Sequence, residues 1–208
     1  MDLYFAPLSC SLATRIALYE SGQEARFHEV VLTTKRTTDG ADYFAIHPMG
    51  QVPALVIDDG EILTEGPAIL QYVADRAPAS GLAPAAGTRA RTRLHQWLNY
   101  VGSEIHKPVF ATIFNPMAPP AAKEYARGLV DRRFDLLSRH LADRPFLVGE
   151  GFTVADAYLT VVLGWTEAAG IDLDAWPVLA AWRARMRERP NVARALGEEL
   201  ALREGARA

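Results

Sequence analysis

The sequence contains a single cysteine in 208 residues and no long uninterrupted apolar segment. One cysteine excludes an intramolecular disulfide and any zinc site that needs several thiolates, and it is typical of a reducing compartment. Apolar runs such as residues 159–163 fall far short of the roughly 20 residues that a membrane span needs. The first residues also lack the basic and apolar regions of a signal peptide. We therefore expect a soluble, cytoplasmic protein.

An excess of one charge sign is absent as well. The chain has 22 Lys and Arg against 25 Asp and Glu, a formal net charge of -3. Nothing in this balance attracts nucleic acid or an anionic membrane, so neither is expected as a partner. The glycine patterns of nucleotide-binding loops and the G-x-S-x-G pattern of α/β-hydrolases are missing too. The five histidines form no His-x-x-x-His pair, and we predict no metal site.

Residues 1–78 alternate between strand and helix patterns. Strands are predicted at residues 2–6, 27–32, 52–57 and 61–64, and the last two flank the hairpin signal Asp58-Asp59-Gly60. Helices are predicted at residues 11–21 and from Pro67 to just before Pro78, with a short helical turn at 43–46. These elements predict a four-stranded α/β layer domain.

Residues 79–87 are small, with two glycines and a proline, and are expected to form a linker. From residue 88 to residue 208 the apolar spacing is that of helices. Four helices are predicted from their apolar positions, around 94–105, 129–141, 154–165 and 178–186. The second domain is therefore expected to be all-α.

Cys10 is expected at the junction between the first strand and the first helix. A helix N-terminus stabilises negative charge, and the thiolate is the nucleophilic form of cysteine. A lone cysteine is more often a small buried apolar residue. Cys10 is thus a candidate nucleophile whose role depends on what surrounds it.

Two further loops are expected to lie at strand ends. A cis bond before Pro53 would leave the backbone of Val52 able to pair with an extended peptide-like ligand, although a trans proline on an edge strand is the simpler interpretation. The helix start at Gly66 offers N–H groups to a carboxylate, and Glu65 could bind an ammonium group, although both could serve in helix capping alone. Open α/β sheets bind ligands at strand ends, so these loops and Cys10 would suit a small zwitterionic peptide thiol.

The segment from Thr153 to Asp156 matches a capping box with aspartate in place of the usual glutamate, and we interpret it as structural. His106 and Lys107 are expected at the end of the first helix of the second domain. A lone histidine in that place is usually a surface or helix-end residue.

Taken together, these residues resemble the cytosolic glutathione S-transferases, specifically the bacterial beta class. The resemblance covers nearly the whole chain and depends on the order and spacing of several motifs. In the first domain these are Ala6-Pro7-x-x-Cys10-Ser11-Leu12, Gly50-Gln51-Val52-Pro53-Ala54-Leu55, Leu63-Thr64-Glu65-Gly66 and Gln71-Tyr72-Val73-Ala74-Asp75. In the second domain they are Gln96-Trp97-Leu98-Asn99, Ser103-Glu104-x-His106-Lys107 and Phe152-Thr153-Val154-Ala155-Asp156-Ala157-Tyr158.

The resemblance implies a thioredoxin-like N-terminal domain, an all-helical C-terminal domain, and a homodimer. It implies glutathione as co-substrate. Cys10 would lie beside the glutathione sulfur and form a mixed disulfide with it. Val52 would pair its backbone with the tripeptide beside a cis Pro53, and Glu65 and Gly66 would hold the γ-glutamyl end.

The same resemblance assigns roles to further residues. Lys35 and Lys107 would face carboxylates or the thiolate, and His106 would lie near the sulfur as a polar or proton-handling partner. Asn99, Ser103 and Glu104 would reach a glutathione site of the neighbouring subunit. The acceptor pocket would be bordered by Phe110, Phe114, Met117 and Trp165. Ser11 is expected to contact glutathione, and Ser9, Ser11 and Tyr4 are alternative hydroxyl activators that rank below Cys10.

Four positions depart from patterns seen among these enzymes. Leu8-Ser9 stands where beta-class chains commonly have Gly-Ala, and Pro108 stands where glycine is frequent. Gly66 replaces the serine of many other classes, as it does in beta-class members.

The sequence therefore predicts a glutathione transferase that promotes attack of the glutathione thiolate on hydrophobic electrophilic small molecules. Thiol–disulfide exchange through Cys10 is a further expected activity, with glutathione as the resolving thiol. The alternatives are a specialised glutathione-dependent dehalogenase or isomerase, and a transferase-like binding module without catalysis.

Overall fold

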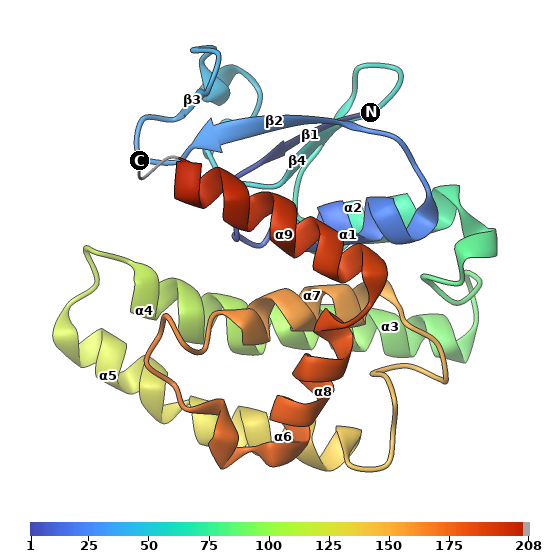
Figure 1. Ribbon diagram of the computed structural model, residues 1–208, viewed down its shortest axis with the longest axis vertical. Coiled ribbons are helices and arrows are strands. Elements are labelled where there is room, and N and C mark those ends of the chain that lie inside the picture. Colours follow the sequence, from blue (N-terminus) through green and yellow to red (C-terminus); the bar gives the residue numbers. More distant parts are fainter. Residues whose placement is uncertain (206–208) are drawn as a thin grey trace. The chain divides into compact units, whose positions relative to one another are not determined.

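The computed structural model describes residues 1–205, and these residues form two compact units. The first comprises Met1–Leu82 together with the C-terminal segment from Arg189, and the second comprises Ala83–Glu188. Each unit has its own set of elements (Figure 1). The division falls inside the expected linker at residues 79–87. It differs from the expected domains at the C-terminal end, because helix α9, Pro190–Gly205, packs on helix α1 of the first unit.

Within the described residues, the first unit is built on a sheet of five strands in the order β3-β2-β1-β4-β5. Strands β1 and β2 are parallel, and the other neighbours are antiparallel. The strands are β1 (Asp2–Phe5), β2 (Arg26–Val31), β3 (Arg36–Thr37), β4 (Ala54–Val56) and β5 (Ile62–Leu63). The expected hairpin is confirmed by the pairing of β4 with β5.

The prediction of four strands is wrong by one. Strand β3 lies in the polar stretch that follows β2, and it pairs with Val30 and Val31. A two-residue strand is too short to show the alternation that identifies strands in a sequence. Thr37 is nevertheless buried, which explains why the chain turns back along β2 at this point.

Helices cover one face of this sheet. Helices α1 (Leu12–Ser21) and α2 (Gly66–Arg76) pack against each other, and α9 runs beside α1 (Figure 1). Successive side chains of β1 point to opposite faces of the sheet, as the pleat of a strand requires. Leu3 and Phe5 are buried, and Arg15 of α1 lies over the ring of Phe5. Tyr4 points to the other face, where its ring meets Tyr43 of the short helix η1 (Tyr43–Ala45).

The second unit is helical throughout its regular elements. Its helices are α3 (Arg89–Asn99), η3 (Tyr100–Ala111), α4 (Thr112–Phe114), α5 (Pro120–Gly128), α6 (Val130–Leu141), α7 (Val154–Gly164), η4 (Leu173–Ala175) and α8 (Pro177–Arg187). Helix α7 is buried along its whole length from Val154 to Leu163 and forms the centre of this unit. The predicted helices at 129–141, 154–165 and 178–186 are confirmed as α6, α7 and α8, whereas α5 and α9 were not predicted.

The first helix of the second unit does not end at His106-Lys107 as expected. Helix α3 passes directly into η3, a π-helix that contains Pro108 and continues to Ala111. A proline inside an α-helix would normally end or kink it. The wider π-helical turn carries the chain past Pro108, so His106 lies within the helix.

The capping box at the start of α7 is confirmed. The Thr153 backbone N–H and its hydroxyl both donate to Oδ2 of Asp156, at 2.9 and 2.7 Å. The other carboxylate oxygen accepts from the backbone N–H of Leu147 at 2.8 Å. Burial raises the pKa of Asp156 to about 6, despite these donors. The motif joins the start of α7 to the loop before it, which is the structural role that the sequence indicated.

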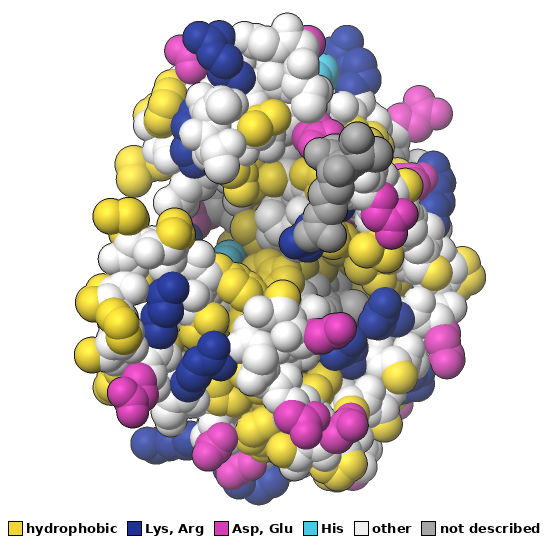
Figure 2. All heavy atoms as spheres, turned by 60° about the vertical axis from the view of Figure 1, so that its left-hand side comes forward, with side chains coloured by type: hydrophobic (Ala, Val, Ile, Leu, Met, Phe, Trp, Pro, Cys, Tyr) yellow, Lys and Arg dark blue, Asp and Glu magenta, His cyan; other side chains and the backbone are white. Residues whose placement is uncertain are grey.

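On the face drawn in Figure 2, basic and acidic side chains are interspersed, as the small net charge leads one to expect. Among residues 1–205, no helix combines the length and the apolar character that crossing a bilayer requires.

Candidate functional site

Cys10 lies in the turn that leads into α1. Its carbonyl accepts from the backbone N–H of Ala13, so the residue forms part of the helix N-terminus, where the helix dipole favours negative charge. The Cys10 thiol donates to the backbone carbonyl of Val52 at 3.1 Å. Two residues 42 positions apart in the sequence are thereby joined at the end of β1.

Val52 precedes Pro53 in the loop that enters β4, and the bond between them is cis. The simpler interpretation from the sequence, a trans proline, is therefore wrong. Pro53 in turn lies against Gly66, since a Cβ placed on Gly66 would meet the proline ring at 3.9 Å. The loop from Val52 thus connects the Cys10 turn with the start of α2.

Helix α2 begins at Gly66, directly after β5. The Glu65 carbonyl accepts from the N–H groups of Ala68 and Ile69, so Glu65 occupies the N-cap. Glu65 has φ 66°, in the left-handed region that a residue with a Cβ seldom adopts. Its side chain caps nothing and is exposed, which leaves the carboxylate available beside the helix start. The arrangement offers a carboxylate for an ammonium group and a helix N-terminus for an anion.

The loop before Pro53 is held by a series of side-chain donors. Lys35 Nζ donates to the Gly50 carbonyl at 2.8 Å, and the Tyr43 hydroxyl donates to the Gln51 carbonyl at 2.6 Å. Cys10 donates to the next carbonyl, that of Val52. Lys35, which is expected to face a carboxylate or the thiolate, is thus bound to the loop that precedes Pro53. Burial strongly raises the pKa of Tyr43, which keeps its hydroxyl protonated as a donor.

The alternative hydroxyl groups are engaged within the turn or in the sheet. The Ser11 side chain is buried, donates to the Ala6 carbonyl at 3.3 Å and lies 2.7 Å from the Ser9 hydroxyl. Tyr4 stacks on His28, and burial raises the pKa of its phenol. The buried Ser11 hydroxyl therefore shapes the Cys10 turn, and its expected contact with glutathione stays a prediction.

A second group of predicted residues lies in the helical unit and centres on His106 of η3. The Nδ1 atom of His106 is 2.6 Å from the Tyr158 hydroxyl, and the imidazole meets Trp165 edge-on at 4.9 Å. Burial, with a smaller contribution from Lys107, lowers the pKa of His106 to about 4. The imidazole is therefore neutral at pH 7 and is a weak base, so it serves as a polar hydrogen-bonding group.

The predicted acceptor residues form an aromatic cluster beside His106. Trp165 contacts Phe110 and Phe114 edge-on, with ring centroids 5.6 and 6.2 Å apart, and those two rings stack on each other at 6.0 Å. Phe110 is buried and Phe114 is partly exposed. Met117 is 85% exposed in the loop after α4, outside this cluster. The cluster is an apolar surface of the kind that binds aromatic or alkyl groups.

The remaining predicted residues lie along one stretch of helix. The Asn99 side chain donates to the His95 carbonyl, and the Ser103 hydroxyl donates to the Asn99 carbonyl. Glu104 is bound to Arg133 of α6 at 2.8 Å, whereas Lys107 is exposed.

Among residues 1–205 no cluster of three or more His, Cys, Asp or Glu side chains has a geometry that could hold a metal ion.

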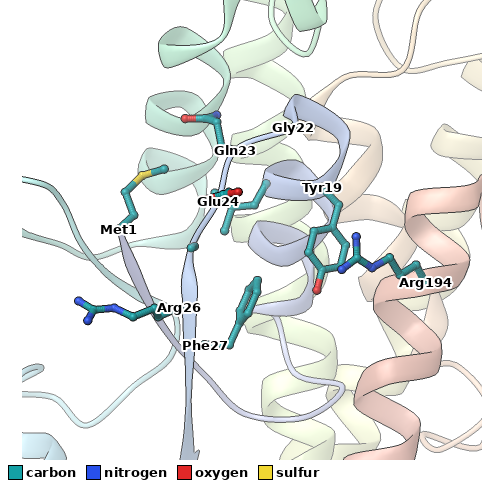
Figure 3. A pocket seen from close by; sticks show the side chains of 10 residues that line it. Met1, Tyr19, Gly22, Gln23, Glu24, Arg26, Phe27 and Arg194 are labelled. Carbon is teal, nitrogen blue, oxygen red and sulfur yellow. The ribbon is translucent and has the colours of Figure 1, made fainter.

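A separate pocket of about 750 Å³ lies at the other end of α1 (Figure 3). It is lined by Met1, Tyr19, Arg26, Phe27 and Arg194, among others, and by none of the predicted site residues. Arg26 pairs with Asp2, and Arg194 lies over the Tyr19 ring and pairs with Glu198. Its two arginines are therefore already paired with carboxylates of the same unit.

Tyr43, Tyr158 and Arg133 were not identified from the sequence as functional positions. Tyr158 was assigned to the buried face of a helix, and Tyr43 only to a helical turn. The spacing that identifies a core residue carries no information about where a hydroxyl points. Tyr158 and Arg133 make their contacts across 52 and 29 positions, which only the fold brings together, whereas Tyr43 binds a carbonyl eight positions away.

Comparison with known proteins places both units in one family. Residues 9–76 match the family model described as "Glutathione S-transferase, N-terminal domain", and residues 102–190 match "Glutathione S-transferase, C-terminal domain". The chain is 42% identical over 199 residues to glutathione S-transferase GstA of Escherichia coli O157:H7, covering 96% of this chain and 98% of that protein.

Solved structures agree with this result. A sphingomonad glutathione S-transferase in complex with glutathione is 45% identical, with a TM-score of 0.92 and coverage of 96% of this chain and 98% of the other. The bacterial beta-class enzyme of Sphingomonas chungbukensis is 43% identical, with the same TM-score and the same coverage. The expected fold class, a thioredoxin-like domain with a helical domain, is confirmed.

Proposed function

Because the chain belongs to the glutathione S-transferase family and resembles a bacterial beta-class enzyme, we propose that Cys10, Val52, Pro53, Glu65 and Gly66 form its glutathione site. The enzyme is a glutathione transferase, and glutathione is its co-substrate. The observation that carries the proposal is the hydrogen bond from the Cys10 thiol to the carbonyl just before the cis proline.

Each part of glutathione has a complementary group in this site. The Val52 backbone, which lies before strand β4, pairs with the cysteinyl amide. The Glu65 carboxylate binds the γ-glutamyl ammonium group, and the start of α2 at Gly66 binds the neighbouring carboxylate. Ser11 lines the sulfur end through its backbone, and Lys35 supplies positive charge near a carboxylate of the tripeptide.

The chemistry follows from the position of Cys10 at the start of α1. The glutathione thiolate is stabilised there and attacks an electrophilic carbon, displacing the leaving group and forming a C–S bond. In the exchange reaction, the Cys10 thiolate attacks the glutathione sulfur of a mixed disulfide between glutathione and a second thiol. A bond forms between the two sulfurs, and the second thiol leaves as a thiolate that takes up a proton. A glutathione thiolate then attacks the mixed disulfide on Cys10, which releases Cys10 and forms oxidised glutathione.

The helical unit supplies the remaining groups. For His106 the family resemblance implies a place near the glutathione sulfur, where its imidazole, neutral at pH 7 because burial lowers its pKa, acts as a polar hydrogen-bonding partner, and Lys107 provides positive charge. Phe110, Phe114 and Trp165 bind hydrophobic electrophiles, with Met117 at the border. Asn99, Ser103 and Glu104 reach the site of a neighbouring subunit in a homodimer. The proposed compartment is the cytoplasm, where glutathione is abundant and a lone thiol stays reduced.

Family membership supports general transferase activity over a specialised dehalogenase or isomerase, and over a module without catalysis. The three groups that the chemistry needs, Cys10, Glu65 and His106, are all present.

Amide NMR during a glutathione titration tests where the tripeptide binds. The expected result is that the amides of Cys10, Val52 and Gly66 shift most, and that the aryl conjugate of glutathione shifts the same amides together with those of Phe110 and Trp165. Shifts confined to the pocket of Figure 3, around Tyr19 and Arg26, would overturn the assignment of the site.

A further inference from the structure

The His106 imidazole of η3 is in contact with a buried tyrosine of the helical unit. Its Nδ1 atom lies 2.6 Å from the hydroxyl oxygen of Tyr158, which belongs to the buried helix α7. The two rings meet edge-on, with centroids 5.8 Å apart and planes at 86°. Helix α7 packs against η3, and a Cβ placed on Gly102 of η3 would lie 3.8 Å from the same hydroxyl. The Tyr158 hydroxyl therefore lies directly against η3.

A second ring limits how the imidazole can turn. Trp165, just after α7, contacts His106 with centroids 4.9 Å apart and planes at 60°. Trp165 is itself packed against Phe110 and Phe114. A half-turn of the imidazole would place a carbon atom, instead of Nδ1, against the Tyr158 hydroxyl and would break the hydrogen bond. Each ring nitrogen of His106 therefore has a defined place.

The direction of the hydrogen bond between Tyr158 and His106 decides which ring nitrogen carries the proton. Burial lowers the pKa of His106 to about 4, so the imidazole is neutral at pH 7 and has one N–H donor and one acceptor nitrogen. A phenol is a stronger acid than an imidazole N–H, and an imidazole nitrogen is a better acceptor than a phenol oxygen. The bond therefore forms as O–H···N, and its short length agrees, because hydroxyl donors make shorter hydrogen bonds than N–H donors. Nδ1 is thus the acceptor, and the proton is on Nε2.

This tautomer suits a donor and not a base. Tyr158 occupies Nδ1, and the His106 side chain is partly exposed, so Nε2–H is the polar group that the ring presents to a ligand. A second proton would make the imidazole a cation, which burial and the neighbouring Lys107 both oppose. His106 can therefore donate to an anion from Nε2 without changing its own protonation.

We propose that Tyr158 is a positioning residue for His106: its hydroxyl donates to Nδ1, keeps the proton on Nε2, and so directs a hydrogen-bond donor at the glutathione thiolate. This inference rests on the proposed place of His106 near the glutathione sulfur. A hydrogen bond to an anion is stronger than one between neutral groups, so it favours the thiolate over the thiol. The thiol proton passes to solvent water, and His106 stabilises the thiolate that remains.

The tautomer can be measured by 15N NMR of the histidine side chains without any ligand. The comparison includes Tyr158→Phe and the control Tyr100→Phe, whose hydroxyl donates to the Arg133 carbonyl instead. The His106 signals are identified by their absence in His106→Gln. In the wild type and the control, the proton is expected on Nε2. In Tyr158→Phe the Nδ1 signal is expected to move downfield, as for a nitrogen that has lost its donor.

Two results of this measurement would overturn the proposal. One is a wild-type proton on Nδ1, which would mean that His106 donates to Tyr158, and this result does not depend on the stability of any variant. The other is an Nδ1 signal that stays in place in Tyr158→Phe.

Glutathione then tests the donor role. The absorbance of the bound thiolate reports the pKa of the glutathione thiol, which is expected to be higher in Tyr158→Phe than in the wild type and in Tyr100→Phe. At pH 7, kcat for conjugation is expected to fall by about two- to tenfold in Tyr158→Phe, with KM for glutathione unchanged. Bound glutathione is also expected to shift the wild-type Nε2–H signal.

That last signal separates this proposal from the proposed function. If glutathione shifts the Nε2–H signal but Tyr158→Phe keeps the wild-type thiol pKa and kcat, the positioning role of Tyr158 is wrong. If glutathione binds and leaves the His106 signals unmoved, the place of His106 near the sulfur is wrong, whereas a proton found on Nε2 still supports the tautomer that Tyr158 holds.

Discussion

The thiol of Cys10 donates to the carbonyl oxygen of Val52 at 3.1 Å. It is the last in a series of side-chain donors to successive carbonyls, after Lys35 to Gly50 and Tyr43 to Gln51. These bonds fix the loop whose backbone is proposed to pair with glutathione. The proposed nucleophile, Cys10, and the proposed binding residue, Val52, are therefore directly connected.

Replacing Tyr43 by phenylalanine tests this connection. The variant leaves the Gln51 carbonyl without its buried donor, so the free energy of unfolding is expected to fall by about 1–3 kcal/mol. A looser loop also raises KM for glutathione several-fold while kcat changes less, as steady-state kinetics can measure. The control is Tyr72→Phe, whose hydroxyl is bound only at the surface by Arg76. Equal KM values for both variants would contradict the positioning role of Tyr43.

Glu65→Gln tests the ammonium contact at the start of α2. Loss of a charge-assisted hydrogen bond of about 1.5–3 kcal/mol is expected to raise KM for glutathione by at least about tenfold. A glutathione analogue without the γ-glutamyl amino group separates this contact from other effects. The wild type is expected to bind the analogue weakly, and the variant to bind glutathione and the analogue equally. The exposed Glu61→Gln is the control, and an identical preference in Glu65→Gln and wild type would exclude the contact.

Asp156→Ala tests the capping box of α7. The variant leaves the buried N–H groups of Leu147 and Thr153 without an acceptor, so the expected loss in the free energy of unfolding is about 3 kcal/mol or more. Thr153→Ala removes only the hydroxyl and is expected to cost about 1 kcal/mol. Denaturant titration measures both, with the exposed Asp131→Ala of α6 as control. A loss for Asp156→Ala no larger than for the control would contradict the structural role of the box.

A pH-dependent stability is expected from Glu199 of α9. Its buried carboxylate accepts from the Leu8 N–H at 2.6 Å and lies 3.1 Å from Arg15 Nε. Burial, with smaller contributions from Glu198 and Glu29, raises its pKa to about 7, although Leu8 and Arg15 act in the opposite direction. Because the pKa is higher in the folded chain than the ordinary 4.5, this stabilisation is complete below pH 4.5 and is lost as the pH rises through 7.

Glu199→Gln removes that titration. Relative to the variant, the wild type is expected to lose about 3 kcal/mol of unfolding free energy between pH 4.5 and 8, measured by denaturant titration at each pH. The adjacent Glu198→Gln should show the opposite sign. Burial alone would raise the pKa of Glu198, but its hydrogen bonds with Tyr19 and Arg194 hold it below the ordinary value. A wild-type curve parallel to that of Glu199→Gln would contradict this account.

Elements defined by local chemistry could be predicted from the sequence. The Asp58-Asp59-Gly60 turn predicts a hairpin because glycine and aspartate favour its backbone angles, and the capping box depends on residues only three positions apart. The two-residue strand β3 could not be predicted, since its polar residues are placed there by pairing with β2.

The candidate site could be proposed from the sequence where a nucleophile, a proline or a helix start lies at a recognisable turn, as at Cys10, Pro53 and Gly66. The contacts that His106 and Glu104 make could not be predicted, because they join segments that are distant in the sequence. Tyr158 and His106 are 52 positions apart, and Arg133 and Glu104 are 29 apart. Periodicity identified Tyr158 as buried, but the direction of its hydroxyl depends on how α7 packs against η3.

Intact-protein mass spectrometry after exposure to oxidised glutathione tests the central claim most directly, because Cys10 is the only thiol in the chain. The wild type is predicted to gain one glutathionyl group per chain, which dithiothreitol removes, and Cys10→Ala is predicted to stay at its unmodified mass. Reduced glutathione should also release the adduct at a rate that rises with its concentration. A wild-type chain that remains unmodified under conditions in which it binds glutathione would contradict a site built around the sulfur of Cys10.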